Sequence, residues 1–323
     1  MRKFFHNAKP TAYPNEKIFS FLPHNNTMLH IPVLTKEVLQ YLNPGQNENF
    51  VDCTVGQGGH AKLILEKTEP KGKVLGIDLD LQQIKNSEFL MAGSRGRLIL
   101  INDSYANLQE IVEKINFPQV NGILIDLGIS SEQLESSGRG FTFLKNEPLD
   151  MRYDAVNNGL TAEKIINEWP EDKIENILKE YGEEKFSKKI AKEIIEIRKQ
   201  SRIKTTFGLI EIIKAATPSA YWRGKIHYAT RTFQALRIAV NDELENLKKV
   251  LPEALSVLSA SGRLAVISFH SLEDRIVKDF FNKKTKEGII KILTNKPITA
   301  GTEELGKNPR SRSAKLRAAI KIL

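Results

Sequence analysis

The feature that most constrains the fold is a regular alternation of strand-like apolar runs and helical segments between residues 50 and 126. The runs read FVDCTV, KVLGID, RLILIN and GILIDLG, and helical spacing resumes at His60, Leu81 and Tyr105. This repetition is typical of a parallel, doubly wound sheet, because each strand must cross back over the sheet through a helix before the next one begins. The sequence therefore predicts a Rossmann-like α/β fold.

A glycine-rich turn, TVGQGGHA, joins the first apolar run to the helix that follows it. Gly56, Gly58 and Gly59 permit a tight turn, and without a Cβ the backbone can approach a ligand closely. The free N–H groups of the new helix favour electron-rich ligand atoms. Asp78, about twenty residues further on, can accept hydrogen bonds from ribose hydroxyls. This pattern favours a nucleotide-binding turn over an ordinary strand-to-helix turn.

Polar residues stand at or near the end of each apolar run, and such residues are expected to meet at the carboxyl edge of the sheet. They are Asp52 or Thr54, Asp78, Asn102 or Asp103, and Asp126. The glycine turn also satisfies the dinucleotide fingerprint, so an NAD-dependent oxidoreductase is one alternative. However, no second nucleotide-binding half follows. Several polar strand ends suit a ligand with one ribose and one adenine, such as S-adenosylmethionine.

The strand–helix rhythm stops after Ser131, and helical patterns near 163–169, 174–181, 186–199 and 207–216 predict an inserted helical domain. Four divisions are expected. They are an N-terminal extension at 1–27, the first part of the α/β domain at 28–134, the helical insertion at 135–230 and the second part of the α/β domain at 231–323.

Three further elements are expected in the second part of the α/β domain. The first is one long helix over 232–258, restarted by Pro252. The second is a helix over 271–281 that begins with a capping box of Ser271 and Asp274. The third is a closing pair of strands, GIIKIL and KLRAAIKIL, that completes the parallel sheet.

Charge points to a polyanionic partner. The chain carries a net charge of +9, and residues 185–237 alone hold thirteen Lys or Arg against three Glu. Clustering of this kind favours phosphate contact over merely solvated helix faces. Basic and aromatic residues also interleave in YWRGKIHYATR, which is typical of contact with unpaired RNA bases.

Several classes of protein are disfavoured by what the sequence lacks. No apolar run approaches the roughly 20 residues that span a bilayer, and no secretory signal is evident, so a soluble cytoplasmic protein is expected. The single cysteine, Cys53, cannot form an internal disulfide and lies in a predicted strand. A structural zinc site is thereby disfavoured, and no metal is expected.

Ten segments, in order, carry a family resemblance that covers nearly everything after Met28. They read HIPVL, TVGQGGHA, GIDLD, ILIDLGISSEQL, RGFTF, PLDMRYD, YGEEKFSKKIA, ATRTFQALRIAVNDEL, ISFHSLEDRIVK and NPRSRSAKLR. Together they resemble the bacterial MraW-like methyltransferase family, which modifies N4 of a cytosine in 16S rRNA. The resemblance implies a class I S-adenosylmethionine-dependent methyltransferase fold with an inserted helical substrate-recognition domain. It also implies 16S rRNA or the small ribosomal subunit as partner, near the decoding region, and is compatible with a homodimer.

The same resemblance implies a set of cofactor residues. Gly58, Gly59 and His60 would line the methionine end, and Asp78 would take the ribose. The remaining members of this set are Tyr105 near the adenine, and Asp126 and Gln133 to complete the pocket. Reasoning from residues alone reaches Gly58, Gly59, Asp78 and Asp126, but not Tyr105 or Gln133.

The implied chemistry is direct attack of an exocyclic amine on a sulfonium methyl group, in which positioning supplies much of the catalysis. Candidates to assist the amine are Asp126, Ser130 in DLGISS, and His270 at a strand edge. A Ser/His/Asp hydrolase at SFHSLEDR is disfavoured because no nucleophile elbow is present. Candidate RNA contacts are Arg139, Arg152, Arg198, Lys199, Trp222, Arg223 and Arg231. A catalytically silent RNA-binding assembly factor is the non-enzyme alternative.

Overall fold

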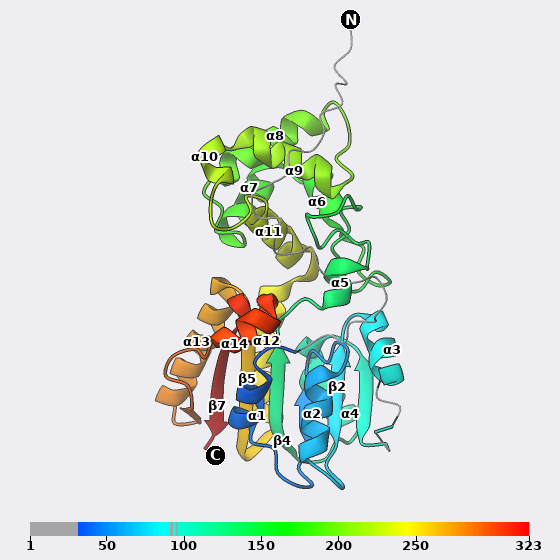
Figure 1. Cartoon of the computed structure of the whole chain (residues 1–323), viewed down its shortest axis with the longest axis vertical. Coiled ribbons are helices and arrows are strands. Elements are labelled where there is room, and N and C mark those ends of the chain that lie inside the picture. Colours follow the sequence, from blue (N-terminus) through cyan, green and yellow to red (C-terminus); the bar gives the residue numbers. More distant parts are fainter. Residues whose placement is uncertain (1–31, 91–92, 95, 323) are drawn as a thin grey trace, which may run out of the picture.

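A computed structural model of the chain describes residues 32–90, 93–94 and 96–322 (Figure 1). The extension predicted at 1–27 lies outside the described residues. Within them, no helix combines the length and apolarity that crossing a membrane requires.

A seven-stranded sheet of order β3-β2-β1-β4-β5-β7-β6 forms one half of the molecule. Its strands are β1 (Phe50–Asp52), β2 (Val74–Asp78), β3 (Leu98–Asn102), β4 (Val120–Asp126), β5 (Leu258–Ser268), β6 (Ile290–Ile292) and β7 (Lys315–Lys321). Strands β1 to β5 run parallel to one another. The Rossmann-like α/β class predicted from the alternating pattern is confirmed.

The closing strands differ from the prediction of a wholly parallel sheet, because β7 is antiparallel to both β5 and β6. Between β6 and β7 the chain forms only the short helix α14 (Thr302–Lys307) and a 3-10 turn, Pro309–Ser313. No long helix carries the chain back across the sheet there. A parallel connection needs such a crossover, so β7 returns in the opposite direction.

Helices cover both faces of the sheet, and the two resulting cores follow from the alternation of side chains along each strand. The helices are α1 (Thr35–Leu42), α2 (Gly59–Lys67), α3 (Leu81–Leu90), α4 (Leu108–Lys114), α12 (Glu243–Val257) and α13 (Ser271–Lys286). Val51 and Ile123 point into the core shared with α4, α12 and α13. Their chain neighbours Phe50 and Leu124 point into the core shared with α1, α2 and α3.

A separate helical unit stands over the carboxyl ends of the parallel strands (Figure 1). Its helices are α5 (Ser131–Glu135), α6 (Ala162–Glu168), α7 (Glu171–Glu180), α8 (Ser187–Arg198), α9 (Thr206–Ala216), α10 (Ser219–Trp222) and α11 (Thr230–Asn241). A core of its own holds the unit together, and it includes Ile165, Leu178 and Ile194. This core continues along α11 as far as Val240. Helix α11 therefore packs as part of the helical unit, although the insertion was predicted to end at residue 230.

The long helix predicted over 232–258 is in fact two helices, α11 and α12, separated at Asp242. Asp242 adopts the left-handed conformation with φ 52°, which Asp tolerates better than most residues. Pro252 does not restart a helix but lies inside α12. The break allows α11 to pack in the helical unit while α12 packs on the sheet.

Helix α13 begins at Ser271, as predicted, and continues to Lys286, but its N-cap lies one residue before the predicted one. His270 is the N-cap, and its side chain accepts from the backbone N–H of Glu273. The Glu273 carboxylate accepts from the backbone N–H of His270 in return. The capping box therefore uses His270 and Glu273, whereas Ser271 and Asp274 were predicted.

Candidate active site

The predicted strand-end residues do meet at one edge of the sheet. The backbone N–H of Asp126, at the end of β4, donates to the hydroxyl of Thr54, just past β1, at 2.7 Å. Asp78, at the end of β2, accepts from the backbone N–H of Gly56 and of Asp80, both at 2.9 Å. These contacts join the ends of three neighbouring strands, so the glycine turn lies directly against Asp78.

His60 lies in the first turn of α2 and is buried, with 6% of its side chain exposed. Neither of its ring nitrogens has a hydrogen-bond partner within the described part of the chain. Nε2 lies 3.5 Å from Oδ2 of Asp126, which is longer than an ordinary hydrogen bond. Buried polar atoms are rarely left unpaired, so these nitrogens fit a ligand or water held at this edge.

Three carboxylates, Asp52, Asp78 and Asp126, make this edge strongly acidic. Burial raises the pKa of Asp52 to about 6, although the nearby His60 opposes the shift. Burial also raises the pKa of Asp78 to about 7, opposed by its hydrogen bonds from Asp80 and Gly56. At both carboxyls the effect of burial outweighs these opposing contacts and favours the protonated form. A positively charged ligand would relieve this cost.

The edge therefore fits S-adenosylmethionine, whose sulfonium and amino groups are cationic. The glycine turn leaves space for it, since a Cβ added at Gly56 would have no neighbour nearer than 3.9 Å. Gly56 and Gly58 have positive φ angles of 51° and 81°, which glycine adopts without strain. Gly59 has a different constraint, because a Cβ there would come within 3.0 Å of the Pro32 side chain.

Gln133 and Tyr105 are placed on either side of this edge. Gln133 is buried on α5, and its Nε2 donates to Oδ2 of Asp80 at 3.0 Å. Its Oε1 accepts from the backbone N–H of Ser130 at 3.0 Å. Tyr105 begins the 3-10 turn Tyr105–Asn107 after β3, and burial raises the pKa of its phenol. The structure thus places both residues beside the strand ends, in segments that follow β3 and β4.

Two of the three catalytic candidates use their side chains to begin helices. The hydroxyl of Ser130 accepts from the backbone N–H of Gln133 at 3.1 Å and caps α5. His270 caps α13 in the same way. The carboxylate of Asp126 accepts one backbone hydrogen bond, from Gly128 at 3.2 Å, and its other oxygen faces His60. Asp126 therefore has the largest unused acceptor capacity among the three.

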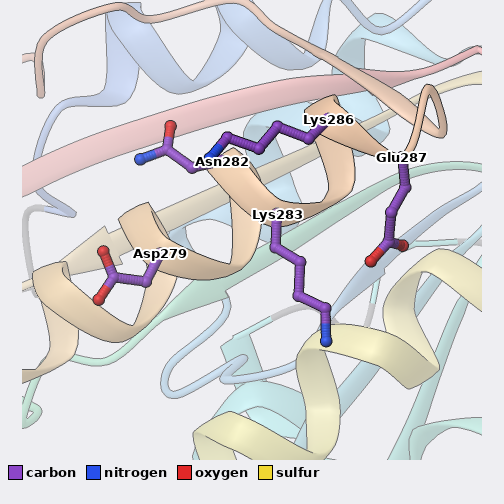
Figure 2. A pocket seen from close by; sticks show the side chains of 5 residues that line it. All are labelled: Asp279, Asn282, Lys283, Lys286 and Glu287. Atoms are coloured by element: carbon purple, nitrogen blue, oxygen red, sulfur yellow. The ribbon is translucent and has the colours of Figure 1, made fainter.

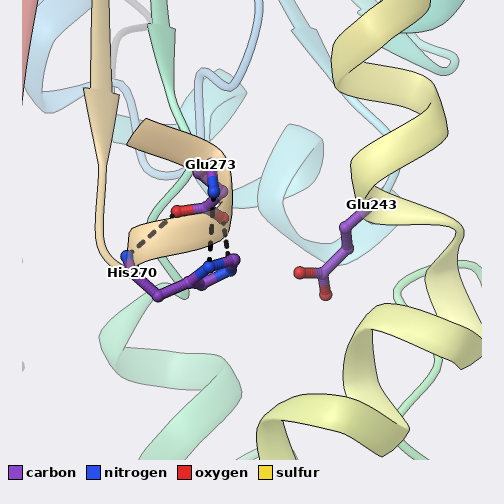
Figure 3. A group of neighbouring side chains, drawn as sticks. All are labelled: Glu243, His270 and Glu273. Atoms are coloured by element: carbon purple, nitrogen blue, oxygen red, sulfur yellow. Dashed lines mark hydrogen bonds and ion pairs between the residues drawn. The ribbon is translucent and has the colours of Figure 1, made fainter. Parts of the chain in front are cut away.

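His270 also belongs to a polar cluster with Glu243 and Glu273, whose ligand atoms lie within 4.8 Å of one another (Figure 3). Nε2 of His270 lies 3.0 Å from the Glu273 carboxylate. Both oxygens of Glu243 accept from the Arg237 guanidinium, at 2.7 and 2.8 Å. This spacing would suit a small ion, but the guanidinium already balances the charge of Glu243. The cluster thus consists of two adjacent pairs, Arg237 with Glu243 between α11 and α12, and His270 with Glu273 at the start of α13.

Four of the predicted RNA-binding arginines are engaged by the chain itself. Arg139 donates to Asp80 at 2.5 Å, and Arg152 donates to the Asp150 carboxylate at 2.7 and 2.8 Å. Arg198 donates to the carbonyls of Ile166 and Trp169, at the end of α6. Arg231 donates to the carbonyl of Glu183. These side chains organise the helical unit and its contacts with the sheet.

The other three predicted RNA contacts are exposed. Lys199 pairs with Glu196 on the surface of α8, and Arg223 follows α10 in an exposed segment. Trp222 is 37% exposed, donates from Nε1 to the hydroxyl of Thr217 and lies beneath the ammonium of Lys214. The indole is thereby held in place with part of its surface open to solvent.

Asp80 was not selected from the sequence, although GIDLD offered two aspartates. It is 3% exposed and accepts from both Gln133 and Arg139. Its neighbour Asp78 drew attention because it ends the strand. No sequence signal distinguishes a buried carboxylate two residues later.

One shallow hollow lies well away from this edge, along the outer side of α13 (Figure 2). Its lining residues are Asp279, Asn282, Lys283, Lys286 and Glu287. All come from α13 or its C-cap, and His270 lies at the opposite end of that helix. The hollow is therefore separate from the strand-end site.

Comparison with known proteins places the chain in a family. The model of the MraW methylase family matches residues 27–322. Ribosomal RNA small subunit methyltransferase H of Heliobacterium mobile is 46% identical over 309 residues, covering 91% of this chain and 99% of that protein. The protein of the same name from Persephonella marina is 45% identical over 293 residues, with the same coverage of both chains.

Solved structures match more distantly. A putative rRNA methylase from Clostridium thermocellum covers 91% of this chain and 100% of its own, with 13% identity and a TM-score of 0.45. That likeness is too low to support an argument about function. The family match and the curated relatives are sufficient by themselves, and the chain belongs to the MraW methylase family.

Proposed function

We propose that this protein transfers a methyl group from S-adenosylmethionine to N4 of a cytosine in small-subunit rRNA. The observation that carries the proposal is the acidic strand edge, where His60, with its unpaired ring nitrogens, lies beside Asp52 and Asp126, and Asp78 ends the neighbouring strand. Such an edge attracts a cationic sulfonium ligand. The name of the curated relatives supports rRNA of the small subunit as the substrate class.

When bound, S-adenosylmethionine supplies an activated methyl group. Asp78 would accept hydrogen bonds from the ribose, because each of its oxygens accepts only one backbone N–H and has a further lone pair. Tyr105 and Gln133 would flank the cofactor from the segments after β3 and β4. All three side chains are positioned by strand ends or by the turns directly after them.

Asp126 is the residue we assign to the attacking amine. The Asp126 carboxylate has a free lone pair that can accept a hydrogen bond from the amine N–H, and this bond orients the nitrogen. The same carboxylate can accept the proton that the amine loses as the new N–C bond forms. Direct displacement needs no covalent enzyme intermediate. Cys53 supports this pathway, since it is fully buried and burial raises the pKa of its thiol, whereas a nucleophilic cysteine needs an accessible thiolate.

Contact with RNA is assigned to two exposed places, the surface around α10 and the C-terminal end of α8, where Lys199 is the C-cap. Trp222 offers part of an indole face for base stacking, and Arg223 and Lys199 offer cations for phosphates. A paired cytosine must leave its helix before N4 can reach the methyl group. The helical unit stands over the carboxyl edge, where it can hold an extruded base.

The two alternatives fit less well. A dinucleotide-binding sheet has two parallel halves, with strand order 3-2-1-4-5-6, whereas here antiparallel β7 follows β5. An oxidoreductase is therefore disfavoured. An assembly factor without catalytic activity would not require a ligand at this edge, and the two buried nitrogens of His60 would then stay unpaired. An activity assay distinguishes this alternative from the proposed enzyme.

The assay incubates the protein with labelled S-adenosylmethionine and either small-subunit particles or free rRNA, followed by nucleoside mass spectrometry. We expect N4-methylcytosine, and we expect its loss in Asp126→Asn even at a concentration of S-adenosylmethionine that saturates the variant. Label on a pyrimidine ring carbon would contradict the N4 assignment. Absence of transfer to either substrate would favour the assembly factor.

A further inference from the structure

We infer that Asp80 is a positioning residue that couples the cofactor pocket to the helical unit. This inference rests on the proposed methyl-transfer function, because it assumes that the cofactor binds beside Asp78. Asp80 lies two residues past the end of β2 and is 3% exposed. Its backbone N–H donates to Oδ1 of Asp78 at 2.9 Å, so the Asp78 carboxylate is held by the backbone of Asp80.

The two oxygens of Asp80 have different tasks. Oδ1 accepts from the backbone N–H of Gln82 at 3.1 Å, in the first turn of α3. Oδ2 accepts from Nε2 of Gln133 at 3.0 Å and from the guanidinium of Arg139 at 2.5 Å. A helix start needs only the first oxygen. The second oxygen joins the turn after β2 to Gln133 and Arg139, which lie 53 and 59 residues later in the sequence.

Gln133 links this carboxylate to the cofactor side. It is buried, and its amide group has a fixed orientation because Oε1 accepts from Ser130 while Nε2 donates to Asp80. Asp78 and Gln133, which flank the proposed cofactor, are therefore both held by Asp80. Binding groups need such support from neighbouring hydrogen bonds to keep a productive geometry.

Arg139 links the same carboxylate to the helical unit. Its other terminal nitrogen donates to the carbonyls of Arg152 and Tyr153, at 3.0 and 3.2 Å. The guanidinium also lies over the ring of Phe141, which stacks on Tyr153. Arg139 therefore joins the two ends of the segment 139–153 by hydrogen bonds, and its guanidinium is held by the carboxylate of Asp80.

Tyr153 extends the network to the break between α11 and α12. Its backbone N–H donates to Asn241 at 2.8 Å, and its hydroxyl donates to Glu243 at 3.2 Å. These two residues flank Asp242, where the helical unit joins the sheet domain. A continuous series of hydrogen bonds therefore runs from Asp78 through Asp80 to this junction.

The test measures binding of S-adenosylhomocysteine by calorimetry and amide hydrogen exchange of residues 139–153, neither of which needs RNA. In the wild type, saturating S-adenosylhomocysteine should slow exchange in this segment by about tenfold or more, because a ligand stabilises the state it binds. Asp80→Asn preserves the oxygen that caps α3 but turns an amide toward Gln133 and Arg139. We expect it to lower affinity by about tenfold or more and to abolish the slowed exchange.

Arg139→Gln provides a sharper separation, because it leaves the contact between Asp80 and Gln133 intact. Affinity for S-adenosylhomocysteine should stay within about threefold of wild type, while protection of 139–153 is lost. Asp150→Asn is the matched control. It breaks another Arg–carboxylate pair in the same segment, and protection on binding should persist.

The inference is wrong if S-adenosylhomocysteine protects 139–153 equally in Arg139→Gln and wild type, or if Asp80→Asn retains wild-type affinity. It is also wrong if the wild type binds without any protection of this segment. A wild-type protein that does not bind S-adenosylhomocysteine would instead contradict the proposed function itself.

Discussion

Replacing Asp78 by Asn should make the ligand-free protein more stable at neutral pH while it weakens cofactor binding. Burial raises the pKa of Asp78 from an ordinary value of 3.8 to about 7. The folded protein therefore binds a proton that the unfolded chain has released between about pH 4 and pH 7. Between these pH values, the free energy of unfolding of the wild type falls as pH rises. Above about pH 7, the folded protein bears the full free-energy cost of an ionised, buried Asp78.

The expected magnitude follows from the shift. Each pH unit between the two pKa values changes the free energy of unfolding by about 1.4 kcal/mol. Between pH 5 and pH 8, only the two units below the folded-state pKa of about 7 contribute. The free energy of unfolding of the wild type should therefore fall by about 2 to 3 kcal/mol over this interval. Asn cannot ionise and escapes this penalty. It also loses one acceptor contact, to Gly56 or Asp80, at a pH-independent cost of about 1 kcal/mol.

Urea unfolding followed by circular dichroism at pH 5, 6, 7 and 8 measures the effect. The free energy of unfolding of Asp78→Asn, minus that of the wild type, should rise by about 2 kcal/mol across the series. Asp279→Asn, whose side chain is 65% exposed on α13, should give a constant difference. A constant difference for Asp78→Asn as well would refute the reasoning. Calorimetry with S-adenosylhomocysteine at pH 8 should show weakened binding by the Asp78 variant.

Three further substitutions test other parts of the structure. Arg198→Met should lower the free energy of unfolding by about 2 kcal/mol, since two carbonyls lose a charged donor. An unchanged urea midpoint would show that Arg198 does not stabilise the fold and would make it a candidate RNA contact again. Gly122→Ala should cost about 1 to 3 kcal/mol in the same assay, because the new Cβ would lie 2.3 Å from the Phe50 ring, whereas Gly306→Ala has open space and should behave as wild type. Trp222→Ala should weaken rRNA binding by about 1 kcal/mol or more in filter binding, and unchanged affinity would remove the indole from the interface.

Local patterns were sufficient to predict the parallel strands and the acidic residues at their carboxyl ends. Apolar runs that alternate with helices specify parallel strands, and the parallel arrangement brings Asp52, Asp78 and Asp126 together whatever the rest of the chain does. The glycine turn was equally accessible, because the conformations at Gly56 and Gly58 are a property of a few consecutive residues.

Contacts between distant segments decided what the sequence could not specify. The helix break at Asp242 depends on two cores that attract α11 and α12 in different directions. The roles of the arginines depend on partners far along the chain, since Arg139 meets Asp80 and Arg198 meets carbonyls at the end of α6.

Composition gives the excess of basic residues, but it does not distinguish an arginine that faces solvent from one that holds the fold together. A charged side chain is a property of the sequence. Its partner is chosen by packing, because burial makes an unpaired charge costly and forces the nearest acceptor into use. The sequence alone therefore determined the parallel strands, their acidic edge and the family resemblance. Only the tertiary structure decided the direction of β7, and which charged side chains pair within the protein, as Arg139 does with Asp80 between the two halves of the molecule.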